Sequence, residues 1–312
     1  MDQQASKARE ILAINVDLSC DHRCELCEKF FNCTSSIKME MYERGRMARA
    51  REVISRIKHK VAIVSGKGGV GKSIVTANLA VSLALMGKKV SILDQDFDGA
   101  SIPRMLGMEG KRLTINDEGI VPIEGPYGIQ VISMGSVTKA EEVLTWYHIM
   151  RRGATEEFLS HVAYGDRDYL LIDLPPGTSS DSMNIMQYIP QLDGAIVITI
   201  PSSVSQNVAK KAGLLCNKAK VNVFGVIENM SGYVCPHCGK KSNILSSGGG
   251  VKLAKDLGVP FLGKIPLDAR LSSLTDKGKP FVGAYPKGVA SISLRRIAAK
   301  LDRELESKNH LS

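Results

Sequence analysis

Short apolar runs alternate with amphipathic stretches from Lys60 to the end of the chain. The apolar runs are rich in β-branched residues and almost continuously hydrophobic, as parallel strands covered on both faces are. The runs that we expect to form strands are Val61–Val64, Val90–Leu93, Ile129–Ile132, Tyr169–Ile172, Gly194–Ile200 and Val223–Ile227. This alternation predicts an α/β fold with a doubly wound, mostly parallel sheet.

Two of the amphipathic stretches give the clearest helix predictions. After the first strand and a glycine-rich turn, a helix ending near Gly87 is expected to bury one face, made of Val75, Leu79, Leu83 and Met86. The last stretch, from Ser291 to Glu306, intersperses apolar residues with charges, which predicts a helix packed on the sheet. The same basic amphipathic pattern also fits a helix lying on a membrane surface.

The residues before position 60 have a different character, being first rich in cysteine and then basic and helix-prone. We therefore divide the chain into a small extension with a basic helical linker, residues 1–59, and a main domain, residues 60–312. The basic run has only Glu52 against it and consists of Arg44, Arg46, Arg49, Arg51, Arg56, Lys58 and Lys60. We interpret it as a solvated helical face, with contact to nucleic acid or an acidic partner as the alternative.

The composition fits one large core in a chain of 312 residues. No apolar run approaches the roughly 20 residues that span a bilayer. No basic segment leads into an apolar stretch at the N-terminus, so we expect no secretory signal and a cytoplasmic location. In that reducing compartment, clustered thiols usually bind metal or perform redox chemistry. Six of the seven cysteines cluster, whereas Cys216 stands alone and fits a small buried apolar residue.

A phosphate-binding loop follows the first strand and opens the first helix of the main domain. The pattern Gly66-x4-Gly71-Lys72-Ser73 in that context is a strong signal for nucleotide binding. Successive backbone N–H groups and the helix N-terminus would surround the phosphates. Lys72 would neutralise phosphate oxygens and Ser73 would ligate Mg²⁺. The expected nucleotide-binding residues are Gly66, Lys67, Gly68, Gly69, Val70, Gly71, Lys72, Ser73 and Ile74.

Carboxylates follow two of the predicted strands, Asp94 and Asp96 after one and Asp173 after the other. The carboxyl ends of the strands are where ligands bind in such sheets, so these groups complete a hydrolase site. Guanine-binding proteins usually carry Asn-Lys-x-Asp after a late strand, but here Glu228-Asn229-Met230-Ser231 follows. ATP is therefore the expected nucleotide, and residues 60–312 are expected to form a P-loop ATPase domain.

The loop Gly66-Lys67-Gly68-Gly69-Val70-Gly71-Lys72 resembles the deviant Walker A loop of the MinD, ParA and nitrogenase iron protein superfamily. The resemblance implies that Lys67 crosses a dimer interface and acts on the partner's nucleotide as an arginine finger does. It also implies that Asp96, with Asp94 as a possible partner, positions the attacking water. Asp173 would hold Mg²⁺ through water. Asn229 would hydrogen-bond the adenine edge, although an asparagine capping a turn is the alternative.

A second cysteine motif, Cys235-Pro236-His237-Cys238, lies in the segment that follows Asn229. Together with the phosphate loop and the Asp-Leu-Pro-Pro-Gly-Thr segment that starts at Asp173, it resembles the Mrp/ApbC/Nbp-type ATPases, carriers and scaffolds of iron–sulfur clusters. Two thiolates supply half of a four-coordinate site, so a two-fold dimer could hold one bridging [4Fe–4S] cluster. Zinc shared by the dimer is an alternative. A dithiol oxidoreductase motif is disfavoured because no thioredoxin-like context surrounds it.

The N-terminal cysteines are Cys20, Cys24, Cys27 and Cys33. The last three have the spacing of the N-terminal [4Fe–4S] motif of Nbp-type scaffolds, whereas Cys20 lies closer than that family places its first cysteine. We expect a cluster here, with zinc as the alternative. The first three also have radical-SAM spacing, but too little chain precedes the phosphate loop to build the required barrel.

The sequence thus predicts an ATP-hydrolysing carrier that forms a homodimer and transfers [4Fe–4S] clusters to apo-proteins. One alternative is a ParA/MinD-like positioning ATPase that binds DNA or membrane. Another is a redox protein resembling the nitrogenase iron protein. That family places its bridging cysteines singly and far apart, so the C-x2-C pair favours a carrier.

Overall fold

In the computed structural model of the protein, the described residues are 20, 23–24, 27–29, 32–35, 37–137, 148–178, 180–235, 238, 240–242 and 247–309. The expected N-terminal extension is therefore described only in part. Pro236 and His237 of the second cysteine motif lie outside the described residues.

The centre of the fold is an eight-stranded sheet. Its strands, in spatial order, are β12 (Phe261–Lys264), β9 (Val223–Glu228), β8 (Gly194–Thr199), β1 (Ile57–Ser65), β7 (Arg167–Asp173), β2 (Val90–Asp94), β6 (Gln130–Ser133) and β5 (Ile123–Glu124). All neighbours pair in parallel except β5 and β6. The expected doubly wound, mostly parallel sheet is confirmed, and the six predicted strands are its six inner ones.

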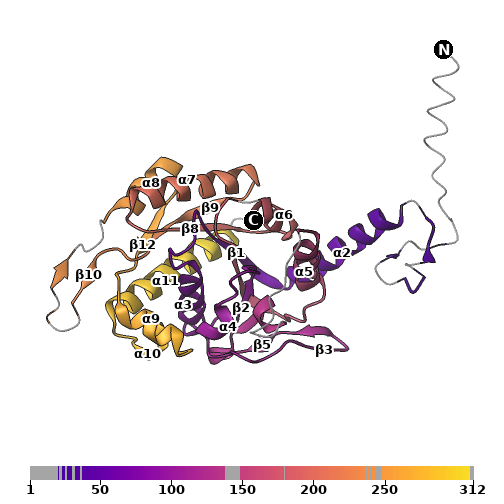
Figure 1. Ribbon diagram of the computed structural model, residues 1–312, viewed down its shortest axis with the longest axis horizontal. Helices are drawn as coiled ribbons and strands as arrows, with labels where there is room; N and C mark the ends of the chain where they lie inside the picture. Colours follow the sequence, from indigo (N-terminus) through magenta and orange to yellow (C-terminus); the bar gives the residue numbers. More distant parts are fainter. Residues whose placement is uncertain are drawn as a thin grey trace, which may run out of the picture.

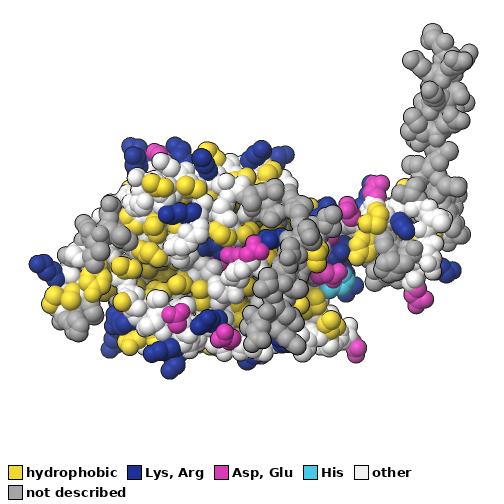
Figure 2. Space-filling view, viewed as in Figure 1, with side chains coloured by type: hydrophobic (Ala, Val, Ile, Leu, Met, Phe, Trp, Pro, Cys, Tyr) yellow, Lys and Arg dark blue, Asp and Glu magenta, His cyan; other side chains and the backbone are white. Residues whose placement is uncertain are grey.

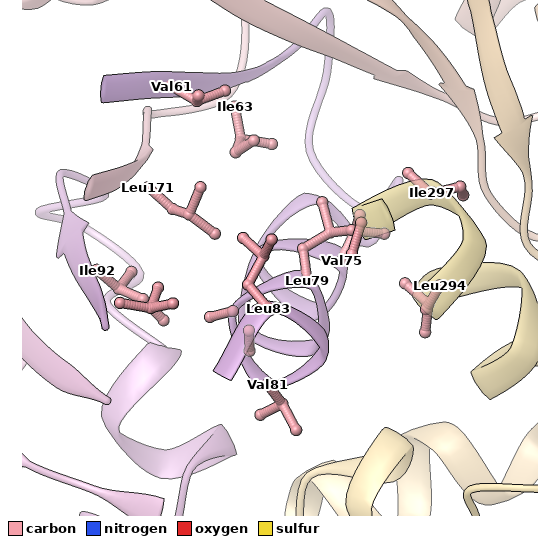
Figure 3. Close-up of a cluster of buried hydrophobic side chains, with 14 of the residues drawn as sticks. Val61, Ile63, Val75, Leu79, Val81, Leu83, Ile92, Leu171, Leu294 and Ile297 are labelled. Atoms are coloured by element: carbon pink, nitrogen blue, oxygen red, sulfur yellow. The ribbon is translucent and has the colours of Figure 1, made fainter. Parts of the chain in front are cut away.

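One face of the sheet packs against α3 (Lys72–Ala84) and α11 (Val289–Asn309). Figure 3 shows Val75, Leu79 and Leu83 of α3 between strand residues and Leu294 and Ile297 of α11. The expectation that Met86 belongs to the buried face of this helix is wrong. The helix ends at Ala84, so Met86 lies beyond its last turn and is 41% exposed.

The opposite face is covered by α2 (Lys38–Ser55), α5 (His148–Ser160), α6 (Ser180–Tyr188), α7 (Ser203–Lys218) and α8 (Gly249–Leu257). Alternate residues of β1 divide between the two cores, with Val61 and Ile63 on one side and Ala62 and Val64 on the other. Cys216 is fully buried in the second core, and burial raises the pKa of its thiol to about 12. It packs as the apolar residue that the sequence suggested.

Shorter elements complete the described fold. They are α4 (Ile102–Met105), α9 (Ala269–Asp276), α10 (Phe281–Ala284), the 3₁₀ turns η3 (Pro126–Gly128) and η4 (Met134–Ser136), and two hairpins, β3 (Thr114–Asn116) with β4 (Gly119–Val121) and β10 (Tyr233–Val234) with β11 (Lys241–Ser242). In Figure 1 β10 and α2 lie toward opposite ends of the molecule.

The first strand begins within the segment expected to be a basic linker. β1 starts at Ile57, and both His59 and Lys60 are buried in it. The Lys60 Nζ donates to the nearby Ile57 carbonyl at 3.0 Å, whereas two acidic side chains that bind this segment lie far along the chain. The Lys60 backbone N–H donates to Asp193 Oδ2 at 2.6 Å, and Lys58 pairs with Glu306 at 2.6 Å.

Within the part of the chain that the structure describes, no helix has the length and apolar character needed to cross a membrane.

Candidate functional site

The phosphate loop joins β1 to α3 at the carboxyl edge of the sheet. Gly69 and Gly71 have φ angles of 76° and 79°, which only glycine adopts without strain. A Cβ on Gly66 would lie 2.2 Å from the Val208 carbonyl carbon, so α7 packs directly on this glycine. The loop lines a cavity of about 180 Å³, into which Asp96 also reaches from the loop after β2. The sequence-predicted loop and Asp96 are thus brought together.

Asp173, at the end of β7, links the loop lysine to the first turn of α3. Its Oδ2 accepts from Lys72 Nζ at 2.5 Å and from the Ser73 hydroxyl at 2.6 Å. Its Oδ1 accepts from the Thr76 hydroxyl at 2.7 Å. Both Lys72 and Asp173 are buried, so each charge is stabilised by the other. Thr76 was not predicted, although its place one turn after Lys72 puts it on the same helix face.

The two carboxylates after β2 occupy different environments. Asp94 is buried and accepts from the Ser133 hydroxyl and the Asp96 backbone N–H, both at 3.1 Å. Burial, with the Asp173 carboxylate nearby, raises the pKa of Asp94 to about 7. Asp96 is less buried, faces the phosphate-loop cavity and accepts from Gly99 N–H at 3.1 Å. Burial also raises the pKa of Asp96. The geometry therefore favours Asp96 over Asp94 as the group that contacts a bound nucleotide or its water.

Asn229 lies against the phosphate loop rather than at the end of an open pocket. Its Nδ2 donates to the Val70 carbonyl at 2.9 Å, and a Cβ on Gly71 would lie 2.4 Å from that nitrogen. The next residue, Met230, has a φ of 54° and also approaches Gly71. The expected bond from Asn229 to adenine stays a prediction, and the contact with Val70 is an additional role.

Glu228, at the end of β9, fixes both ends of the segment that carries the second cysteine motif. Its buried carboxylate accepts from the Ser231 hydroxyl, from Gly248 N–H at 3.2 Å, and from Gly250 N–H at the start of α8. Between these anchors the chain forms the β10–β11 hairpin. Cys235 is partly buried and its N–H donates to the Lys240 carbonyl at 3.0 Å, whereas Cys238 is exposed.

The four N-terminal cysteines lie before α2, with Cys24 buried and Cys20, Cys27 and Cys33 partly buried. Among the described residues, no three His, Cys, Asp or Glu side chains gather closely enough to hold a metal ion. The structure therefore does not bring this predicted ligand set together, and the N-terminal site stays a prediction.

The basic run is not a uniformly solvated face, as the sequence suggested. Arg46 is buried between α2 and α5, and Lys60 is buried in β1. Arg44, Arg56 and Lys58 each pair with an acidic side chain, namely Glu40, Asp166 and Glu306. Figure 2 shows acidic and basic side chains intermixed over α2. The sequence alone does not reveal these pairings, because most of the acidic partners lie more than 100 residues further along the chain.

The parallel sheet, the phosphate loop with Lys67, and the carboxylates at the same edge define a P-loop NTPase of the ParA and MinD type. More particularly, the chain belongs to the iron-transfer P-loop NTPase family: the ParA family model described as "NUBPL iron-transfer P-loop NTPase" matches residues 56–302. The family predicted from the sequence is confirmed.

Curated relatives agree with this assignment. The chain is 44% identical over 290 residues to an iron-sulfur cluster carrier protein of Methanocaldococcus jannaschii, covering 93% of this chain and 98% of the relative. It is 40% identical over 253 residues to the cytosolic Fe-S cluster assembly factor NUBP2 of Rattus norvegicus, covering 80% and 93% of the two chains.

Solved structures share the fold. A nucleotide-binding protein of Archaeoglobus fulgidus, solved in complex with ADP, is 38% identical with a TM-score of 0.67, covering 75% of this chain and 92% of that one. The cell division ATPase MinD of Pyrococcus furiosus has a TM-score of 0.62 at 24% identity, covering 79% and 99%. The likeness to MinD shows the common fold alone.

Proposed function

We propose that this chain is an ATP-hydrolysing carrier that assembles [4Fe–4S] clusters and transfers them to apo-proteins. The observation that carries the proposal is a cysteine pair on a hairpin that leaves the sheet beside the phosphate loop. The same short segment contacts the loop through Asn229 and supplies Cys235. Family membership and the named carriers among the relatives support it. The name of the rat relative supports a cytoplasmic location.

The nucleotide would be bound by the loop amides and by Lys72, with the terminal phosphates near Asp96. Ser73 and Asp173 offer adjacent hard oxygen ligands, which fit Mg²⁺ held by Ser73 directly and by Asp173 through water. Bound there, Mg²⁺ would offset phosphate charge. Lys72 would exchange its pair with Asp173 for one with the phosphates. Asp96 would orient the attacking water.

Lys67 is proposed to act across a homodimer. It lines the phosphate-loop cavity and is only partly buried. We expect Lys67→Ala to lower the ATP hydrolysis rate by about 1,000-fold, as loss of an arginine finger does, while ATP affinity of the monomer is kept. Hydrolysis measured over a range of protein concentrations, with ATP binding measured separately, checks this. Equal loss of binding and hydrolysis would instead mean that Lys67 holds the nucleotide of its own chain.

The cargo would bridge Cys235 and Cys238 of two copies. Each copy supplies two thiolates, and two-fold symmetry brings equivalent pairs together into the four that one cluster needs. Zinc, held by the same four thiolates, is the competing occupant. Exposure of Cys238 suits a cluster that must leave, because a recipient's thiolates can reach it.

Anaerobic reconstitution with iron and sulfide tests this proposal. We expect Cys235→Ala with Cys238→Ala to lose the share of iron and of the brown chromophore that bridges the dimer. Cys216→Ala is the matched control, because that thiol is buried in the core and should not affect iron content. If the double variant keeps all of the iron, or if native protein takes up zinc and no cluster, the assignment of the cargo to this pair is wrong.

Cys20, Cys24, Cys27 and Cys33 are proposed to hold a second metal centre, a cluster or zinc. Four thiols so close in sequence suit either. Among the described residues, no three of these thiols lie close enough together to hold a metal ion.

A further inference from the structure

Helix α5 binds α2 through a buried guanidinium. The Arg46 side chain is 9% exposed, and its Nη2 donates to Glu157 Oε1 at 2.9 Å and to the Gly153 carbonyl at 3.2 Å. Its Nη1 donates to Tyr42 of α2 at 3.1 Å and lies 3.5 Å from Glu156 Oε2. A buried charge of this kind keeps its position only while its partners are in place. The position of α2 is therefore tied to that of α5.

The same helix holds the loop that carries Asp96. The Thr155 hydroxyl donates to Gln95 Oε1 at 2.7 Å, and both side chains are buried. Gln95 Nε2 finds no acceptor among the described atoms, so this contact is what fixes the Gln95 side chain. Arg151 Nη2 donates to both carboxylate oxygens of Asp98, at 2.7 and 3.0 Å. Residues on both sides of Asp96 are thus bound to α5.

α5 also reaches the segment after Asp173. The Arg152 guanidinium lies over the ring of Tyr188 in α6, 5.1 Å from its centroid, and pairs with Glu43 of α2 at 3.2 Å. The Gln95 N–H donates to the Asp173 carbonyl at 2.9 Å. One helix of 13 residues therefore contacts α2, the loop containing Asp96, and the helix that follows the Asp173 segment.

We propose that α5 is a coupling helix, through which α2 and the nucleotide site alter each other's state. The N-terminal cysteine segment is joined to α2, whose Lys38 Nζ donates to the Cys33 carbonyl at 2.8 Å. Thr155 and Glu156 are adjacent, so a shift of the Asp96 loop on ATP binding moves the carboxylates that hold Arg46. By thermodynamic reciprocity, the factor by which ATP binding shifts the equilibrium between two positions of α2 is also the factor by which those two positions differ in ATP affinity. Thr155 and Arg151 are positioning residues for Asp96. The inference rests on the proposed ATP hydrolysis and adds its link to the N-terminal segment.

Hydrogen exchange of the α2 amides tests the coupling in full-length protein without added iron. We expect ATP to change exchange across residues 38–55 in the native chain, and Thr155→Val to abolish that change. Thr155→Val should also lower kcat about tenfold with little change in KM for ATP, because it acts through Asp96. Thr155→Ser, which restores the hydroxyl, should recover both. If ATP does not change hydrogen exchange of the α2 amides in the native chain, the proposal is overturned.

Substitutions in α2 test the reverse effect, that of α2 on ATP affinity. Arg46→Met should shift the ATP dissociation constant about fivefold or more, the usual lower range of allosteric coupling. Arg46→Lys keeps the positive charge but loses the forked guanidinium. Its ATP dissociation constant should lie between those of Arg46→Met and native protein. Asp166→Asn is the control, since it breaks the exposed Arg56–Asp166 pair at the end of α2 without touching α5. Unchanged ATP affinity in Arg46→Met, or an equal shift in Asp166→Asn, contradicts coupling through α5.

These measurements are independent of the cargo. Failure of the coupling leaves iron loss in the Cys235→Ala, Cys238→Ala variant unaffected. Retention of iron by that variant would overturn carriage at the hairpin and leave the exchange results standing.

Discussion

At the phosphate-binding edge, Lys72, Asp94 and Asp173 are buried and held by several hydrogen bonds, whereas on the cysteine hairpin Cys238 is exposed and the two strands are two residues each. Phosphoryl transfer needs charged groups fixed in advance and shielded from water. A cluster that is to be delivered needs ligands within reach of a recipient. The molecule therefore separates a buried nucleotide site from the accessible hairpin that we propose as the cargo site, and joins them through the segment between Asn229 and Cys235.

Of the three tests of this contrast, the one with the largest expected effect concerns Asp96, the less buried of the two carboxylates after β2. Asp96→Asn should lower kcat for ATP hydrolysis by about 100-fold, the usual loss when one group that acts at the transition state is removed. ATP affinity and iron content should stay near native values. Asp117→Asn, on the exposed β3–β4 turn, is the control. A variant that hydrolyses ATP at the native rate would show that the rigid edge uses another group.

The second prediction concerns the electrostatic cost of that rigid edge. A carboxyl whose pKa rises on folding stabilises the fold at low pH, and this contribution is lost as pH rises through the folded-state value, about 7 for Asp94. Between about pH 5.5 and about pH 8, nucleotide-free native protein should lose on the order of 2 kcal/mol relative to Asp94→Asn. Urea unfolding at both pH values measures this. Parallel pH profiles for the two proteins would mean that Asp94 ionises normally.

The smallest expected effect tests Asn229, which lies between the phosphate-binding edge and the cysteine hairpin. Asn229→Ala leaves the buried Val70 carbonyl without its side-chain donor, which should lower the free energy of unfolding by about 1–2 kcal/mol. ATP affinity should fall as well, because the loop is less well fixed. Asn217→Ala, on the exposed side of α7, should leave both quantities unchanged. If Asn229→Ala weakens ATP binding with no loss of stability, its role is contact with the nucleotide alone.

The sequence predicted what depends on neighbouring residues. The inner strands follow from apolar runs, and the loop from Gly66 to Ser73 follows from glycine spacing beside a strand. It missed what depends on distant residues. From the sequence, Arg46 resembles an exposed charge, because its partner Glu157 lies 111 positions later in the chain. Thr155 and Gln95 meet across 60 positions, and the edge strand β12 is too short, with Gly263 inside it, to stand out.

Glu228 bears on how this architecture changes over evolution. Its carboxylate binds Ser231 at the start of the cysteine-bearing segment and Gly248 and Gly250 at its end, so one side chain holds both ends of that segment together. Insertions, deletions or new metal ligands between those points leave the two anchors, and hence the sheet edge, unchanged. Under the proposed function, changes confined to the hairpin would therefore alter the bound cargo and leave the ATPase site unchanged.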